Sequence, residues 1–358
     1  MQIDMHFYGV YALARAAGMG VSIAGKIAYA SQFVDDAVDD GHIVLGDNRA
    51  IVPAMTSHKP IDYQNSLAGD QWKVWIPFHF LPGYEGTKFI DRLVCEKDSA
   101  PARKMLAYTL DGTNGPFWPH MIGIAAHVYA DTFAHYGFIG ISHDNNKVDE
   151  KTIKISPKHS GGITGYLTAK FEEFKTRFIS GFAEVIPVGH GAVGTYPDRP
   201  YLSWEYIYQL RKEGSARKKV TRDNLKDFLE GSERIHEYFK RFVQLDPKHG
   251  EASGAKDWAE IEPAVRSILK TEGPKDTRIE KWVAHLKKGT FCKATKADRD
   301  LKYNEGLWRA RRAELELGGR GLIENSNACK FILAARRFRN YVLRDLLPDT
   351  GLTLPKNS

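Results

Sequence analysis

One apolar segment of the chain, 120–138, carries polar residues at regular intervals. His127, Asp131 and His135 occupy every fourth position, and the residues between them are mostly apolar. An α-helix turns by about 100° per residue, so these three side chains share one stripe of a helix. Burying such groups without partners is unfavourable by several kcal/mol. Imidazole nitrogens and carboxylate oxygens are the usual ligands of zinc and of non-haem iron or manganese. The stripe therefore predicts metal binding.

Two other interpretations of the stripe stay open. His127 and Asp131 would also suit acid–base catalysis without a metal, and histidines in a helix are often structural. The spacing favours more than one ion. With a rise of about 1.5 Å per residue, His127 and His135 lie roughly 12 Å apart along the axis. Ligand bonds near 2 Å are too short for one ion to reach both. Asp131 would bridge two ions, whereas His120, about 10 Å beyond His127, would be a supporting or structural group.

Other segments must supply the remaining ligands, because one helix covers only one side of a metal site. Carboxylates at a helix C-terminus are disfavoured by the helix dipole, which indicates a nearby cation at the end of the helix expected over 22–38. His190 has a glycine on each side, and these glycines would let the backbone approach a site closely. Asp198, in the same loop as that histidine, would ligate a metal or bind substrate. The further candidates are His6 in "IDMHFYG", Asp35 or its neighbour Asp36 in "SQFVDDA", His79 in "WIPFHFLPG" and His190 in "PVGHGAVGTYPDRP".

The elements that hold these residues are expected to be mostly helical. Apolar spacing predicts helices near 7–18, 22–38, 88–97, 100–110, 119–137 and 165–183. The predicted fold is a multi-helix bundle with a metal site in its interior and a small irregular or β excursion near 42–80. A change in composition near residue 205 suggests a metal-binding helical core, 1–205. The charged helical region 206–358 would pack on this core, or the two would form one continuous domain.

Composition limits the classes of partner. The 358 residues carry a net charge of +7, which favours anionic small-molecule or lipid substrates. No basic-aromatic groove is apparent, so long nucleic acid is not expected. Cys95, Cys292 and Cys329 form no CxxC pair and are expected to be reduced thiols. The sequence has no signal-peptide pattern and no run long enough for a transmembrane helix, and we expect a cytoplasmic protein.

Five ordered motifs resemble a family of uncharacterised proteins, DUF6765, over roughly residues 1–205. They are "MQIDMHFYGVYALARAAG", "AYASQFVDDA", "PFHFLP", "HVYADTFAHYGF" and "GHGAVGTYPDRPYLSW". The family implies no activity.

The order of the candidate ligands is also distantly similar to that of zinc-dependent phospholipase C and the S1/P1 nucleases. These all-α enzymes hold three zinc ions. This chain departs from those enzymes in three ways. It begins with methionine instead of a ligating tryptophan. The histidine after HxxxD follows by only four residues, and the acid next to the later histidine is not evident. The acid that should accompany His190 would be Glu184 or Asp198, or it would be absent. These departures favour a dinuclear site over a trinuclear one.

The resulting hypothesis is a metal-dependent phosphoester hydrolase with two or three zinc ions, for which iron or manganese could substitute. Asp36 would orient the attacking water and Arg199 would contact the substrate anion. The metal ligands would be His6, Asp35, His79, His127, Asp131, His135 and His190. One alternative is a non-haem di-iron or di-manganese oxygenase of the HD-like helical type, although its His-Asp dipeptide occurs only at His143–Asp144. A non-enzymatic binding module stabilised by metal is the other.

Overall fold

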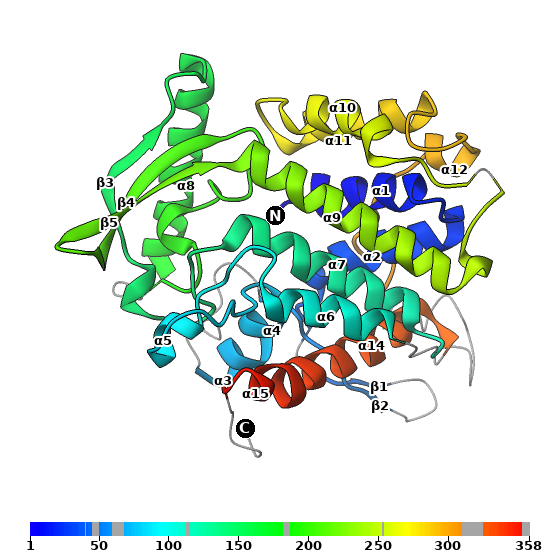
Figure 1. The fold of residues 1–358 in the computed structure, drawn as a ribbon, viewed down its shortest axis with the longest axis horizontal. Coiled ribbons are helices and arrows are strands. Elements are labelled where there is room, and N and C mark those ends of the chain that lie inside the picture. Colours follow the sequence, from blue (N-terminus) through cyan, green and yellow to red (C-terminus); the bar gives the residue numbers. More distant parts are fainter. Residues whose placement is uncertain are drawn as a thin grey trace.

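A computed structural model describes residues 1–39, 41–44, 50–58, 68–111, 115–181, 187–252, 254–309 and 325–352. The fold is mostly helical and is organised around the central helix α7 (Trp118–His135), nearly all of which is buried. The helices with the most extensive packing against α7 (Figure 1) are α2 (Val21–Asp36), α6 (Ala100–Leu110), α9 (Asn224–Leu245) and α14 (Asn327–Tyr341). The helices expected over 22–38, 100–110 and 119–137 are therefore present.

The contact between α2 and α7 depends on a glycine. A Cβ atom placed on Gly123 would lie 2.3 Å from the carbonyl oxygen of Ile27 and 2.7 Å from the Cβ of Ala30. Both distances are too short for any real side chain, so only glycine permits this approach of the two backbones. The end of α2, which carries Asp35, is thereby held close to α7.

An antiparallel sheet of three strands lies at one end of the helices, in the order β3 (Val148–Ile155), β4 (Ser203–Glu213) and β5 (Ala216–Asp223). Trp204, Tyr206 and Tyr208 alternate along β4 and are buried. The expectation that strands occur only near 42–80 is therefore wrong. That stretch contains only the short pair β1 (Ile43–Val44) and β2 (Ala50–Ile51), and its segments 45–49 and 59–67 lie outside the described residues.

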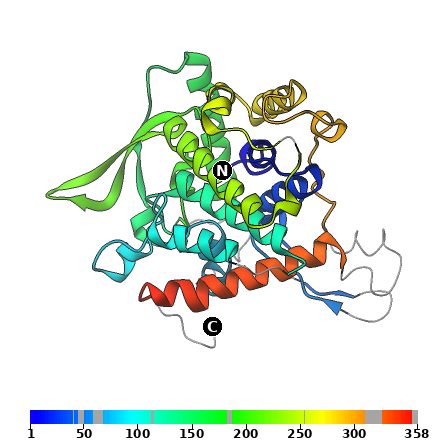
Figure 2. The ribbon, with the colours of Figure 1, turned by 45° about the vertical axis from the view of Figure 1, so that its right-hand side comes forward.

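The first helical turns and the C-terminal helices meet in a shared core. The chain starts with the π-helix η1 (Asp4–Gly9), followed by α1 (Val10–Ala16); α9 packs against α1, and α11 (Lys275–Lys287) packs against η1. One hydrophobic cluster contains Phe133 on α7, Phe239 on α9 and Phe338 on α14. Figure 2 shows α14 running beneath the other helices, with the hairpin β4–β5 projecting on the opposite side from α12.

Further helices complete the fold. None of the helices in the described part of the chain combines the length and apolar character needed to cross a membrane. The remaining helices are α3 (Ala68–Asp70), η3 (Gln71–Trp75), α4 (Ile76–Phe78), α5 (Phe89–Arg92), η4 (Asp144–Asn146), α8 (Gly161–Gly181), η5 (Gly191–Val193), η6 (Pro247–His249), α10 (Trp258–Leu269), α12 (Lys296–Arg299), η8 (Val342–Leu346) and α15 (Leu347–Asp349).

Candidate metal centre

Three groups of histidine and carboxylate side chains meet at the C-terminal half of α7. Within each group, one ligand atom from every residue lies within 4.8 Å of the others. His127 and His135 fall in different groups, as their separation along the helix predicts. The groups are His6, His127 and Asp131; Asp35, His79 and His127; and His135, His190 and Asp198. The structure thus brings together all seven residues that the sequence nominated as ligands, and adds Asp198.

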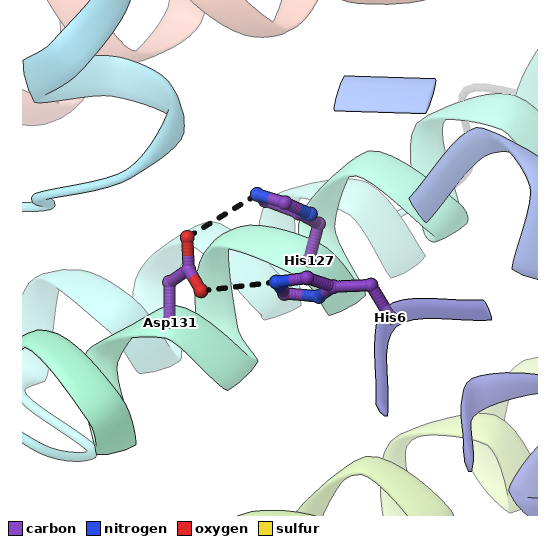
Figure 3. A group of neighbouring side chains, drawn as sticks. All are labelled: His6, His127 and Asp131. Carbon is purple, nitrogen blue, oxygen red and sulfur yellow. Dashed lines mark hydrogen bonds and ion pairs between the residues drawn. The ribbon is translucent and has the colours of Figure 1, made fainter. Parts of the chain in front are cut away.

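The carboxylate of Asp131 contacts residues of the first two groups, and Figure 3 shows one of its oxygens directed at His6 and the other at His127. Its Oδ1 is 3.1 Å from His6 Nε2, and its Oδ2 is 3.2 Å from His127 Nε2. Oδ2 is also 3.3 Å from His79 Nδ1. The two oxygens of one carboxylate therefore face different sets of nitrogens, which is the arrangement a bridging ligand needs.

The amino group of Met1 also reaches this centre. Its nitrogen lies 2.6 Å from Asp131 Oδ1, 3.2 Å from Asp198 Oδ1 and 3.4 Å from His135 Nε2. Burial disfavours the charged amine, but the carboxylates of Asp131, Asp198 and Asp35 outweigh burial and raise its pKa from 8.0 to about 11. Residue types carry no signal for this contact, since it involves a backbone group, and sequence reasoning missed it.

The two neighbouring acids at the end of α2 have different surroundings. Asp35 Oδ1 lies 3.8 Å from His127 Nε2 and 3.9 Å from His79 Nδ1. Asp36 instead accepts hydrogen bonds from the Tyr303 hydroxyl (2.5 Å) and the Gln32 amide (3.3 Å). Burial raises the pKa of Asp36 to about 6, although the Tyr303 hydrogen bond opposes the shift. Asp35 is therefore the acid that joins the centre.

The third group resolves which acid accompanies His190. Asp198 Oδ1 lies 3.2 Å from His135 Nε2, and its Oδ2 lies 3.7 Å from His190 Nε2. Burial tends to raise the pKa of Asp198, but the Met1 ammonium and the two imidazoles lower it well below its usual range. Glu184, the other acid considered, lies outside the described residues.

Backbone carbonyls determine which nitrogen of three histidines carries a proton. His79 Nε2 is 2.9 Å from the carbonyl oxygen of Thr56, His135 Nδ1 is 2.8 Å from that of His79, and His190 Nδ1 is 2.8 Å from that of Gly194. A carbonyl oxygen only accepts, so each of these ring nitrogens donates its hydrogen. In a neutral ring the other nitrogen then presents a lone pair, and in all three it faces the carboxylates of the centre.

Burial keeps three of the imidazole rings in the centre neutral at pH 7. It lowers the pKa of His6, His127 and His190 from 6.5 to about 4. At neutral pH, His190 Nε2 consequently points a lone pair at a carboxylate oxygen, and two acceptors repel unless a cation lies between them. This donor set fits a metal ion. Ligating histidines characteristically donate their other ring hydrogen to a carbonyl or carboxylate, which orients the ring and raises its basicity.

Four residues considered from the sequence are not members of the three groups. Arg199 donates to the Thr195 hydroxyl at 3.1 Å and lies over the Tyr166 ring. His120 Nε2 lies 3.1 Å from Asn327 Oδ1, as expected for a structural histidine. The dipeptide His143–Asp144 belongs to the turn at η4.

The contacts of this dipeptide are local. His143 Nδ1 accepts from the backbone N–H of Asn145, and Asp144 pairs with Lys147 at 2.7 Å. The hallmark of the HD-like alternative is thus absent from the three groups.

Comparison with known proteins gives a family but no activity. No curated protein and no solved structure matches the chain. The model of DUF6765, a family of unknown function, matches residues 1–346, a longer stretch than the five motifs cover. The chain therefore belongs to the DUF6765 family.

Proposed function

We propose that this protein is a metal-dependent hydrolase of phosphoesters, with a zinc site inside its helical bundle. The observation that carries the proposal is the orientation of the histidines. His79, His135 and His190 each donate one ring hydrogen to a backbone carbonyl and direct the other nitrogen at the shared carboxylates. Lone pairs and carboxylates converging in a buried space favour a cation there.

The three groups suggest up to three ions. Asp35, His79 and His127 would hold one, and His135, His190 and Asp198 a second. The third would lie between His6 and Asp131, with Asp131 shared. The distant likeness to zinc-dependent phospholipase C and the S1/P1 nucleases supports the same count, because those enzymes also hold three zinc ions.

Bound zinc would supply an activated water near neutral pH and would stabilise charge on phosphoryl oxygens. The chain itself would orient the ligands and admit the substrate. The side chain of Asp35 is 32% exposed, against 1% for Asp131, so the site opens toward solvent at Asp35. Asp36 is held by Tyr303 and Gln32, so a water at this opening would be oriented by Asp35, through the carboxylate oxygen that holds no ion.

The substrate class follows from charge and access. A centre rich in cations would bind an anion, and the net charge of +7 suits a phosphorylated small molecule or a phospholipid better than a neutral substrate. Arg199 has no described contact with the three groups, so its role in binding the substrate anion stays a prediction.

Metal content tests the proposal directly. Protein purified without chelators should contain two or three zinc ions per chain by elemental analysis. It should hydrolyse members of a panel of phosphodiesters and phosphomonoesters, lose this activity to a chelator and regain it with zinc. Iron with visible absorbance would favour the oxygenase, and the absence of stoichiometric metal would favour the structural alternative.

A matched pair of variants on α7 separates the two kinds of histidine. His135→Ala should lose at least one zinc ion per chain, because His135 belongs to the third group. His120→Ala is the control: it removes an equally buried histidine of the same helix, and zinc content should be unchanged. Equal zinc content in both variants would contradict the assignment of the third group.

A further inference from the structure

We propose that Arg278 is a positioning residue that fixes the N-terminal segment inside the metal centre. This inference rests on the proposed function, because it assumes that the centre holds zinc. It gives the charged C-terminal region the role of positioning the ligands. Arg278 lies on α11, and its side chain is completely buried. Its Nε donates to Asp4 Oδ2 at 2.5 Å, and its Nη2 donates to Gln2 Oε1 at 3.4 Å.

These two contacts lie between Met1 and His6, the residues that reach the centre. Gln2 directly follows Met1, whose amine lies beside Asp131 and Asp198. Asp4 begins η1, the π-helix that carries His6 two residues later. A π-helix is a rare backbone form that is frequent at functional sites. The guanidinium therefore holds the middle of the short stretch that carries the Met1 amine at one end and His6 at the other.

The opposite side of the guanidinium is anchored to other parts of the fold. Nη1 donates to the carbonyl oxygens of Gly273 (3.0 Å) and Thr271 (3.3 Å), in the loop before α11. The guanidinium also lies 5.3 Å from the centre of the Tyr201 ring. Tyr201 follows Asp198 by three residues in the loop that supplies the third group. Arg278 thus lies between the segment of His6 and the loop of Asp198.

The chemistry of arginine suits this task better than that of lysine. Its planar fork presents donors in fixed directions and stays charged, so it can bind a carboxylate, an amide and carbonyls at once. Lysine would retain the charge and lose the fork. A purely structural ion pair would affect folding alone, whereas a positioning residue would also affect how tightly zinc is held by His6 and Asp131.

Zinc affinity and thermal stability should be measured side by side on the full-length protein. We expect Arg278→Lys to weaken the most weakly held zinc ion by about 10–100-fold, the usual effect of losing a partner that orients a ligand. Arg278→Met should lose about one zinc ion per chain and keep the rest. The control is Arg266→Met on the neighbouring helix α10, where Arg266 is 54% exposed and pairs with Glu262. Its zinc content and affinity should match those of the wild type.

Asp4→Asn provides a second route if Arg278→Met does not fold, because asparagine keeps an acceptor oxygen for Arg278 without the charge. It should weaken the same zinc ion as Arg278→Lys. Variants that melt at lower temperature but hold all zinc with wild-type affinity would overturn the inference and leave Arg278 with a structural role. Wild-type protein without zinc would instead refute the proposed function, so the two failures are distinguishable.

Discussion

At the scale of single residues, Asp131 has the largest number of partners in the candidate metal centre. Nitrogens of Met1, His6, His79 and His127 all lie within 3.3 Å of its two oxygens. Burial tends to raise the pKa of Asp131, but His135, the Met1 ammonium and the other imidazoles lower it well below its usual range. An ionised carboxylate with one oxygen toward each set of nitrogens can serve two ions. Asp198, at the edge of the centre, serves one group only.

This difference predicts unequal losses of metal. Asp131→Asn should remove about two zinc ions per chain, because the amide nitrogen replaces one ligand oxygen and the bridging charge is gone. Asp198→Asn should remove about one zinc ion per chain, because the group of Asp35, His79 and His127 keeps the Asp35 carboxylate. Elemental analysis of the purified variants measures both. Equal losses in the two variants would contradict the bridging position of Asp131.

At the scale of elements, the centre depends on how closely α2 approaches α7. Asp35 sits at the end of α2, and its ligand partner His127 sits on α7, four residues after Gly123. Since a Cβ at position 123 would overlap the backbone of Ile27, glycine there determines the separation of the helices. Packing about one helical turn away from His127 thus determines whether Asp35 reaches its group.

Gly123→Ala should therefore push the helices apart and lower the free energy of unfolding by about 1–3 kcal/mol, as overpacked cores do. Zinc affinity should fall as well, because Asp35 moves away from His127. The control is Gly25→Ala on α2, where an added Cβ meets no atom within 4 Å. This control should gain up to about 1 kcal/mol from helix propensity with unchanged zinc. Denaturant unfolding and zinc titration measure both quantities.

Elements in which apolar and polar residues recur at a regular spacing could be predicted from the sequence, and elements without such a spacing could not. The stripe of His127, Asp131 and His135 is visible because a buried helix displays polar groups at fixed intervals. The strand β5 was not predicted, because it is polar at nearly every position and shows no alternation of apolar and polar residues. Its partner β4 does carry a signal of period two, Trp204, Tyr206 and Tyr208, which would have revealed the sheet.

The missed parts of the centre have a different cause. The Met1 amine carries no residue-type signal, and Arg278 lies among many charged residues of a helical segment. Asp198 was one of two acids compatible with the loop, and only the fold places it beside His190. Long-range contacts of this kind depend on tertiary packing, which one sequence does not display.

At the scale of the whole molecule, the buried histidines make stability depend on pH. His6, His127 and His190 have a pKa of about 4 in the folded protein, against 6.5 for an exposed histidine. Between these values the unfolded chain binds protons that the folded protein excludes. Stability of the metal-free protein is thus greatest above pH 6.5 and falls as pH decreases toward 4.

Urea unfolding of metal-free protein should accordingly show a lower midpoint at pH 5 than at pH 7. Each of the three histidines should contribute on the order of 1 kcal/mol to the difference. His127→Gln should reduce the pH dependence, because glutamine does not titrate. An unchanged midpoint across this range would show that the histidines are not buried as neutral rings in the folded state.

The pairing of Asp4 with Arg278 also has a consequence for biosynthesis. The two residues are 274 positions apart, yet they meet beside the first ligands of the centre. At a synthesis rate of roughly 5–20 residues per second, the ribosome needs about 14–55 s to travel from one to the other. During this interval the early ligands exist without their anchor. Under the proposed function, metal would therefore bind late, after α11 has left the ribosome, and a nascent chain interrupted before residue 278 would lack the contact between Asp4 and Arg278.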